Sequence, residues 1–222
     1  MAVSEGKLIP PGFFLPAAER YDLMGDIDRW VIENAFSSFF EFSERKHDEG
    51  VSNGYVYLAI NLSGNSIGDP SLLGYIHQKL RDHNIPPQNI SFEITETAAI
   101  ANLANATHFI KEMRAIGCHF ALDDFGSGLS SFAYLKNLPV DYLKIDGSFV
   151  KDIVTDPVDH AMVDAINKIG QVMGIRTIAE YVENEDIFYT LRDIGVDFAQ
   201  GFGIGKPEPI FDEDRYHGQM EL

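Results

Sequence analysis

The chain has 222 residues, a formal net charge of −17 and a hydrophobic fraction of 45%. We expect residues 1–222 to form a single domain, because this length is enough for one sizeable core. The negative charge disfavours binding of long nucleic acid, which requires Lys and Arg to neutralise phosphates. A single cysteine, Cys118, excludes an internal disulfide framework and fits a reducing compartment. With no apolar run of membrane-spanning length, we expect a cytoplasmic location, either free or as the cytoplasmic part of a larger membrane-anchored protein.

The first quarter of the chain predicts a loop followed by a long helix. Residues 6–16 are rich in Gly and Pro and indicate a loop. A helix is expected from residue 16 or 17 to about 45, with a break near Gly25, and residues 47–54 read as a turn. The apolar stripe of this helix is expected to contain Trp30, Val31, Ala35, Phe36 and Phe39.

After residue 54 the chain alternates between short apolar runs and helix-like segments. Strands are predicted at 55–62, 90–96, 119–124, 142–146, 176–182 and 197–200. Helices are predicted at 70–83, 101–116, 130–137, 156–173 and 184–194. Alternation of this kind predicts an α/β fold with a parallel sheet. A (β/α)8 TIM barrel requires eight strands. We therefore expect a modified barrel that lacks its first two strands in this chain.

Polar groups end these apolar runs in a regular way. They are Asn61, Glu93, Asp123, Asp124, Lys144, Glu180 and Gln200. The carboxyl ends of barrel strands meet at one rim, where active sites form. These acid and amide oxygen donors, together with one lysine, would make a site for divalent metal ions at such a rim.

The pair Asp123–Asp124 is the most specific part of this pattern. Adjacent strand residues point to opposite faces, so both side chains can share one site only where the strand ends. Gly126 and Gly128 follow directly and indicate that end. A bridging Asp is what a two-metal hydrolase needs, with its ions roughly 3.5–4 Å apart. The alternative is a simple Asp-rich turn.

Glu93 and Lys144 lie inside apolar runs, where an ionised group needs a partner. Glu93 could bind a metal, or it could be an acid on an edge strand facing solvent. Lys144 could hold a nucleophilic water or stabilise charge on a phosphate. It could also pair with Asp123, Asp124 or Asp146 without catalytic work.

The remaining polar groups have weaker signals. Asn61 offers a neutral oxygen that Mg²⁺ and Mn²⁺ accept, or it could cap a turn. Glu180 ends its strand and is a candidate metal ligand. Glu96 lies beyond its strand end and could hydrogen-bond the Asp-Asp-Phe-Gly loop. Gln200 could contact a water or a base.

Together these segments resemble the EAL family, the bacterial phosphodiesterases of cyclic di-GMP. The resemblance extends from about Pro10 to Pro209. The motifs that carry it are Asn-Leu-Ser at 61–63, Phe-Glu-Ile-Thr-Glu at 92–96, Asp-Asp-Phe-Gly-Ser-Gly at 123–128, Leu-Lys-Ile-Asp at 143–146, Ala-Glu-Tyr-Val-Glu at 179–183 and Gln-Gly-Phe at 200–202. The resemblance implies a modified TIM barrel with one antiparallel strand. It also implies hydrolysis of cyclic di-GMP to linear pGpG with two Mg²⁺ or Mn²⁺ ions.

Position by position, the resemblance implies two metal sites. Asn61, Glu93 and Asp123 are expected to bind one ion. Asp123 would bridge to the second ion, which Asp124 and Glu180 would also bind. Asp124 is further expected to contact the substrate.

The resemblance also implies roles for residues that bind no metal. Lys144 would position the attacking water, and Gln200 would be a polar contact for the substrate. Glu96 would steady the loop at 124–131. That loop and the helix after it often lie at a dimer interface in the family, so a homodimer is expected.

The chain departs from the family pattern in two places. Leu129 stands where many members have an aromatic residue. The Glu-Ala-Leu motif, whose Glu is a metal ligand, is expected just before residues 9–16 and is not present there, and Glu5 is a poor substitute. We expect upstream sensory or GGDEF-type domains in the full-length protein. The alternative function is a non-catalytic domain that acts as a cyclic di-GMP receptor or a protein-interaction module.

Overall fold

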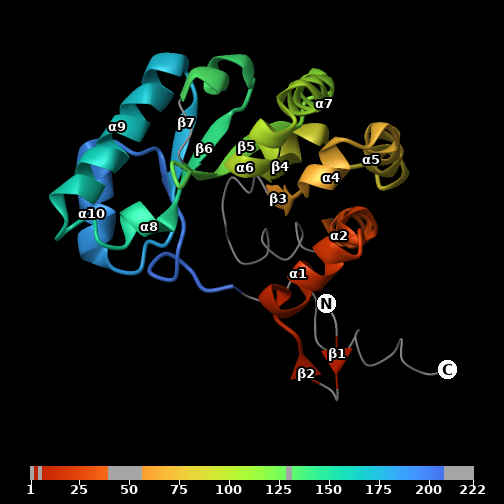
Figure 1. Ribbon diagram of the computed structural model, residues 1–222, viewed down its shortest axis with the longest axis horizontal. Coiled ribbons are helices and arrows are strands. Elements are labelled where there is room, and N and C mark those ends of the chain that lie inside the picture. The colour runs from red at the N-terminus through yellow and green to blue at the C-terminus, as the bar shows by residue number, and fades with distance from the viewer. Residues whose placement is uncertain (1–2, 5–6, 40–56, 129–131, 208–222) are drawn as a thin grey trace.

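The computed structural model describes residues 3–4, 7–39, 57–128 and 132–207, and its centre is a parallel sheet of six strands (Figure 1). The strands pair in the order in which they occur in the chain. They are β3 (Leu58–Asn61), β4 (Ile90–Thr95), β5 (His119–Phe125), β6 (Tyr142–Ile145), β7 (Arg176–Ala179) and β8 (Phe198–Ala199). Each predicted strand is present, and the sheet curves into a half-barrel of the TIM type. The predicted fold class is therefore confirmed.

Between β5 and β6 the described residues form a 3-10 helix, and α-helices connect the other successive strands, as parallel pairing requires. They are α4 (Gly64–Ile67), α5 (Pro70–Asp82), α6 (Glu96–Ala101), α7 (Leu103–Ala115), α8 (Gly147–Val150), α9 (Pro157–Met173) and α10 (Glu185–Ile194). Local sequence sets their ends. The Asp156 side chain accepts a hydrogen bond from the Val158 amide at the start of α9, and Gly174 ends that helix with a φ of 71°.

The N-terminal region differs from the sequence prediction. The pair β1 (Val3–Ser4) and β2 (Lys7–Leu8) is antiparallel, and α1 (Pro11–Arg20) begins where a loop was expected. The loop prediction was wrong from Pro11 onward because proline is favoured in the first helical turn. The break before α2 (Met24–Ser37) lies at residues 21–23 rather than near Gly25, and Asp22 there has a φ of 57°.

Two further predictions need correction. Trp30 is 48% exposed and lies outside the apolar stripe of α2, whose buried positions include Ile32 and Phe36. Residues 132–137, expected as an α-helix, form the 3-10 helix η2 (Phe132–Asn137). A second 3-10 helix, η1 (Pro87–Asn89), precedes β4. The expected turn at 47–54 and the end of the long helix after residue 39 lie outside the described residues.

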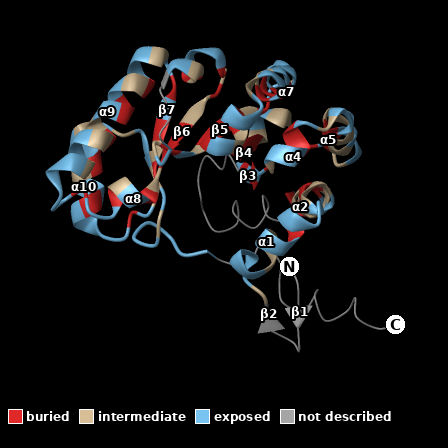
Figure 2. Cartoon of the chain, in the orientation of Figure 1, coloured by how far each residue is buried: buried red, intermediate tan, exposed pale blue. Residues whose placement is uncertain are grey.

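The core lies between the sheet and its helices. Buried positions of the helices face the strands (Figure 2), with α2 against β3, α7 against β5 and α9 against β6 and β7. The ring of Phe120 lies 5.7 Å from Phe92 and 5.9 Å from Phe109, measured between centroids. Strand β4 is buried on both faces, as is typical of a parallel sheet. This packing fixes the carboxyl ends of the strands along one rim.

No helix among the described residues is both long and apolar enough to cross a membrane.

Candidate metal centre

The Lys144 ammonium is the centre of a group of carboxylates at the rim. Its Nζ lies 2.8 Å from one oxygen each of Glu93, Asp123 and Glu180. Lys144 belongs to β6 and is 4% exposed, while the three acids come from β4, from β5 and from the residue after β7. Four neighbouring strands thus bring these side chains together. A buried ammonium is stable only with such partners.

The electrostatics of the group show an excess of negative charge. Burial alone would lower the pKa of Lys144, but Glu93, Asp123 and Glu180 outweigh burial and raise it. Burial raises the pKa of Glu180 even though Lys144 opposes the shift. Burial and the neighbouring Asp123 also raise the pKa of Asp124. One ammonium is therefore insufficient for these carboxylates, and an added cation would stabilise their ionised forms.

Asp123, Asp124 and Glu180 form a compact donor set. Each offers a carboxylate oxygen, and these oxygens lie within 4.8 Å of one another. Asp123 Oδ1 is buried and, among the described residues, accepts no hydrogen bond apart from its ion pair with Lys144. Because Lys144 divides its single positive charge among three carboxylates, a bound cation would further stabilise this buried oxygen. This donor set is suited to a hard divalent cation.

Local backbone geometry explains how two consecutive aspartates share one site. The strand does not end at Asp124, as the sequence suggested, but continues to Phe125. The pairing of β5 with β6 shifts register between Leu122 and Phe125, and Asp124 has a φ of 53°. A bulge with a left-handed residue interrupts the normal alternation of side chains. Both carboxylates can therefore approach Glu180.

Asn61 and Gln200 lie at the two ends of the same rim. Asn61 ends β3 and pairs in register with Glu93, so it is adjacent to the carboxylate group. Gln200 follows β8. Its backbone N–H donates to the Ala179 carbonyl at 2.8 Å, and its backbone carbonyl accepts from the Val182 amide at 3.0 Å. The side chains of Asn61 and Gln200 are exposed. Both are therefore open to a ligand at the rim.

Glu96 has a different environment from the other acids. It is the first residue of α6 and is 3% exposed. Its Oε2 accepts the Gly126 amide hydrogen at 2.9 Å, and its Oε1 accepts the Tyr134 hydroxyl hydrogen at 2.6 Å. Burial and Glu96 together raise the pKa of Tyr134. Glu96 thus joins the segment after Asp124 to η2.

Sequence reasoning did not identify Tyr134. It lies in a short helix with no distinctive spacing, and only the fold brings its hydroxyl to Glu96.

Comparison with known proteins identifies the family. The EAL domain family matches residues 2–207. The chain is 44% identical over 205 residues to the cyclic di-GMP phosphodiesterase PdeB of Shewanella oneidensis. The aligned residues make up 92% of this chain and 23% of PdeB. It is also 36% identical over 206 residues to the cyclic di-GMP phosphodiesterase PdeF of Escherichia coli, with coverage of 93% and 27%. The chain thus spans about a quarter of the length of these curated relatives.

A solved structure is similar as well. The MucR phosphodiesterase in complex with c-di-GMP superposes with a TM-score of 0.82 at 32% identity, covering 96% of this chain and 82% of that one. The family match spans all of the described residues, and the six-stranded half-barrel agrees with it. The chain therefore belongs to the EAL domain family.

Proposed function

We propose that this chain is a metal-dependent phosphodiesterase domain that hydrolyses cyclic di-GMP to linear pGpG. The observation that carries the proposal is the convergence of Glu93, Asp123 and Glu180 on Lys144 at the carboxyl rim. Relatives at 44% and 36% identity are named cyclic di-GMP phosphodiesterases. The MucR structure contains c-di-GMP on the same fold.

The rim would hold two divalent ions, Mg²⁺ or Mn²⁺. Asn61, Glu93 and Asp123 would hold one ion, and Asp123, Asp124 and Glu180 would hold the other. Asp123 Oδ1 is buried and shares its one partner among the described residues, the Lys144 ammonium, with two other carboxylates, which favours a cation at this point. When bound, the ions would lower the pKa of a water molecule and stabilise the attacking and leaving oxygens of the phosphodiester.

The residues of the chain itself would bind and orient. Because its carboxylate neighbours raise the pKa of Lys144, the side chain stays an ammonium near neutral pH. Its three N–H groups are directed at carboxylates in this structure, so it would donate to the attacking water once bound ions take over one of these carboxylates, and it would not act as a base. Asp124 and Gln200 would contact the substrate at the open rim. Glu96 would hold the segment at Gly126 in place through its hydrogen bond.

The second candidate is a receptor that binds cyclic di-GMP without cleaving it. A FimX EAL domain of Xanthomonas citri, 28% identical with a TM-score of 0.81, has been solved in complex with c-diGMP, covering 95% of this chain and 81% of that one. EAL folds can therefore be isolated with intact ligand. A receptor would bind cyclic di-GMP and release no pGpG.

The test is chromatographic analysis of cyclic di-GMP after incubation with the purified protein and Mg²⁺ or Mn²⁺. We expect pGpG to accumulate and EDTA to prevent it. Asp123→Asn should reduce the rate about 100-fold or more, because residues that only orient metal ligands already cost 10–100-fold. The matched control is Asp152→Asn, an exposed acid paired with Lys151, which should keep the wild-type rate. Tight binding with no pGpG would refute the enzyme and favour the receptor.

The whole protein's partners also belong to this proposal. MucR of Pseudomonas aeruginosa is named a bifunctional diguanylate cyclase/cyclic di-GMP phosphodiesterase. By analogy, sensory or GGDEF-type domains would accompany this domain in a cytoplasmic, homodimeric protein. Light scattering on the full-length protein tests the dimer.

A further inference from the structure

A buried acid outside the rim group contacts the turn that carries Asn61. Asp28 lies in α2 and is 4% exposed. Its Oδ2 accepts the Ser63 amide hydrogen at 2.9 Å. Ser63 lies two residues after Asn61 and 35 residues after Asp28. A carboxylate is costly to bury without such a bond, so the contact constrains both segments.

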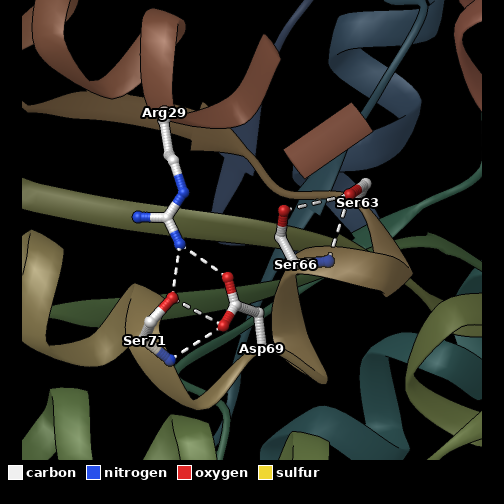
Figure 3. A network of polar contacts seen from close by, with 5 residues as sticks. All are labelled: Arg29, Ser63, Ser66, Asp69 and Ser71. Carbon is white, nitrogen blue, oxygen red and sulfur yellow. Dashed lines mark hydrogen bonds and ion pairs between the residues drawn. The ribbon is translucent and has the colours of Figure 1, made fainter. Parts of the chain in front are cut away.

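The Asp28 contact completes an unusual helix cap. Ser63 is the N-cap of α4, and its Oγ accepts the Ser66 amide hydrogen at 3.3 Å (Figure 3). In a capping box, the residue three positions after the N-cap binds the N-cap amide. Here that residue is Ser66, whose Oγ lies 3.2 Å from the Ser63 Oγ instead. Asp28 supplies the missing acceptor from a different helix.

The turn is therefore held from two sides. The Leu62 amide donates to the Glu93 carbonyl at 2.9 Å, which ties the turn to β4. The Ser63 amide donates to Asp28, which ties it to α2. Asn61 precedes both bonds and lies opposite Glu93.

We infer that Asp28 is a positioning residue that holds Asn61 beside Glu93 and so sets the affinity of that end of the rim for a divalent cation. The inference rests on the proposed function, because it takes Asn61 as a cation ligand. Asp28 does not itself touch the cation. Its effect acts through the Ser63 amide and the backbone of the turn.

The same helix carries a matched control. Arg29 Nη2 lies 2.5 Å from Asp69 Oδ2 and donates to Ser71 Oγ at 2.7 Å (Figure 3). Like the Asp28 contact, it connects α2 to the chain after β3. It does so at the start of α5 and not at the turn that contains Ser63. Removing it should loosen α2 without releasing the Ser63 amide.

The experiment compares Asp28→Ala with Arg29→Ala in the purified protein. Mn²⁺ binding is measured by titration calorimetry or by electron paramagnetic resonance, and folding by thermal unfolding in EDTA. We expect both variants to unfold at a lower temperature. Only Asp28→Ala should weaken Mn²⁺ binding, by about tenfold, the range for residues that orient metal ligands. Asp28→Asn keeps an acceptor oxygen and should restore binding.

A double variant separates positioning from general loosening. In an Asn61→Ala background, Asp28→Ala should have no further effect on Mn²⁺ affinity. Equal weakening by Arg29→Ala, or unchanged Mn²⁺ affinity in folded Asp28→Ala, overturns the inference. If Asp28→Ala does not fold, Asp28→Ser carries the same test, because its shorter side chain does not reach Ser63. A wild-type protein that binds no Mn²⁺ refutes the proposed function and this inference with it.

Discussion

Replacing Lys144 with methionine tests the charge balance of the rim directly. Lys144→Met keeps the length and apolar stem of the side chain but removes the ammonium. Glu93, Asp123 and Glu180 then lose the partner that each has at 2.8 Å. Removing one partner of a buried ion pair typically costs about 3–5 kcal/mol. For a chain of this size, about 1 kcal/mol shifts the melting temperature by roughly 2–4 °C. We therefore expect the metal-free variant to melt roughly 6–20 °C lower.

Added cation and pH should both change the stability that Lys144→Met loses relative to the wild type, which we call its deficit. Mn²⁺ among the same carboxylates replaces the lost positive charge, so the deficit should shrink when Mn²⁺ is present. The raised pKa of Lys144 means that deprotonation of the lysine removes none of its contribution to stability until the pH rises above 10.5. Glu180 already has a raised pKa, and loss of Lys144 raises it further. Ionising that carboxylate then destabilises the fold, so the deficit grows as the pH rises above 4.5 and shrinks toward acid.

Thermal unfolding by circular dichroism at pH 5 and pH 8, in EDTA and in Mn²⁺, measures all of these effects. Lys151→Met is the matched control, because Lys151 and its partner Asp152 are each 57% exposed. Such exposed pairs contribute about 0–1 kcal/mol. A Lys144→Met deficit that is the same at both pH values and in both solutions would refute the electrostatic reasoning.

Three further predictions concern residues around the rim and in the core. Gly147→Ala should lower the unfolding free energy by about 1–3 kcal/mol, because the new Cβ would lie 2.9 Å from the Tyr181 Cβ; denaturant unfolding measures this. Tyr134→Phe removes the 2.6 Å hydrogen bond to buried Glu96 and should cost about 1–3 kcal/mol while raising the Mn²⁺ concentration needed for half-maximal activity. Burial raises the pKa of Cys118 from 9.0 to about 12, so its thiol should destabilise the fold by about 1.4 kcal/mol per unit as the pH rises from 9 to 12.

Each of these predictions has an internal control. Tyr181→Gly should relieve the Gly147→Ala defect in a double variant, and additive losses would contradict the steric explanation. Tyr75→Phe removes a hydroxyl bonded to the Arg29 carbonyl at 3.1 Å and should leave the Mn²⁺ requirement unchanged. For Cys118, the unfolding free energies of the wild type and of Cys118→Ala are compared at each pH. If the two free energies fall in parallel as the pH rises, the explanation by a buried thiol is contradicted.

The strands and their polar ends could be predicted from the sequence because they depend on local pattern. Short continuous apolar runs such as 120–122 indicate strands that are buried on both faces. The topology of a barrel then places their carboxyl ends together. These two rules are enough to select Glu93, Asp123, Lys144 and Glu180 as rim residues.

Other features could not be predicted because they depend on contacts distant in sequence or on local backbone geometry. The left-handed Asp124 within a bulge, which lets two adjacent aspartates share a site, has no sequence periodicity. The start of α1 at Pro11 was missed because Gly and Pro indicate loops more often than first helical turns.

Local sequence specifies which residue types end each strand, and hence the chemistry available at the rim. Only the packing of the elements determines that one lysine forms ion pairs with three carboxylates, that Tyr134 donates to Glu96 and that Asp28 accepts from Ser63. No local pattern indicates these contacts, because side-chain periodicity reports only which face of an element is buried. Hydrogen bonds between residues 35 to 51 positions apart depend on how the elements pack.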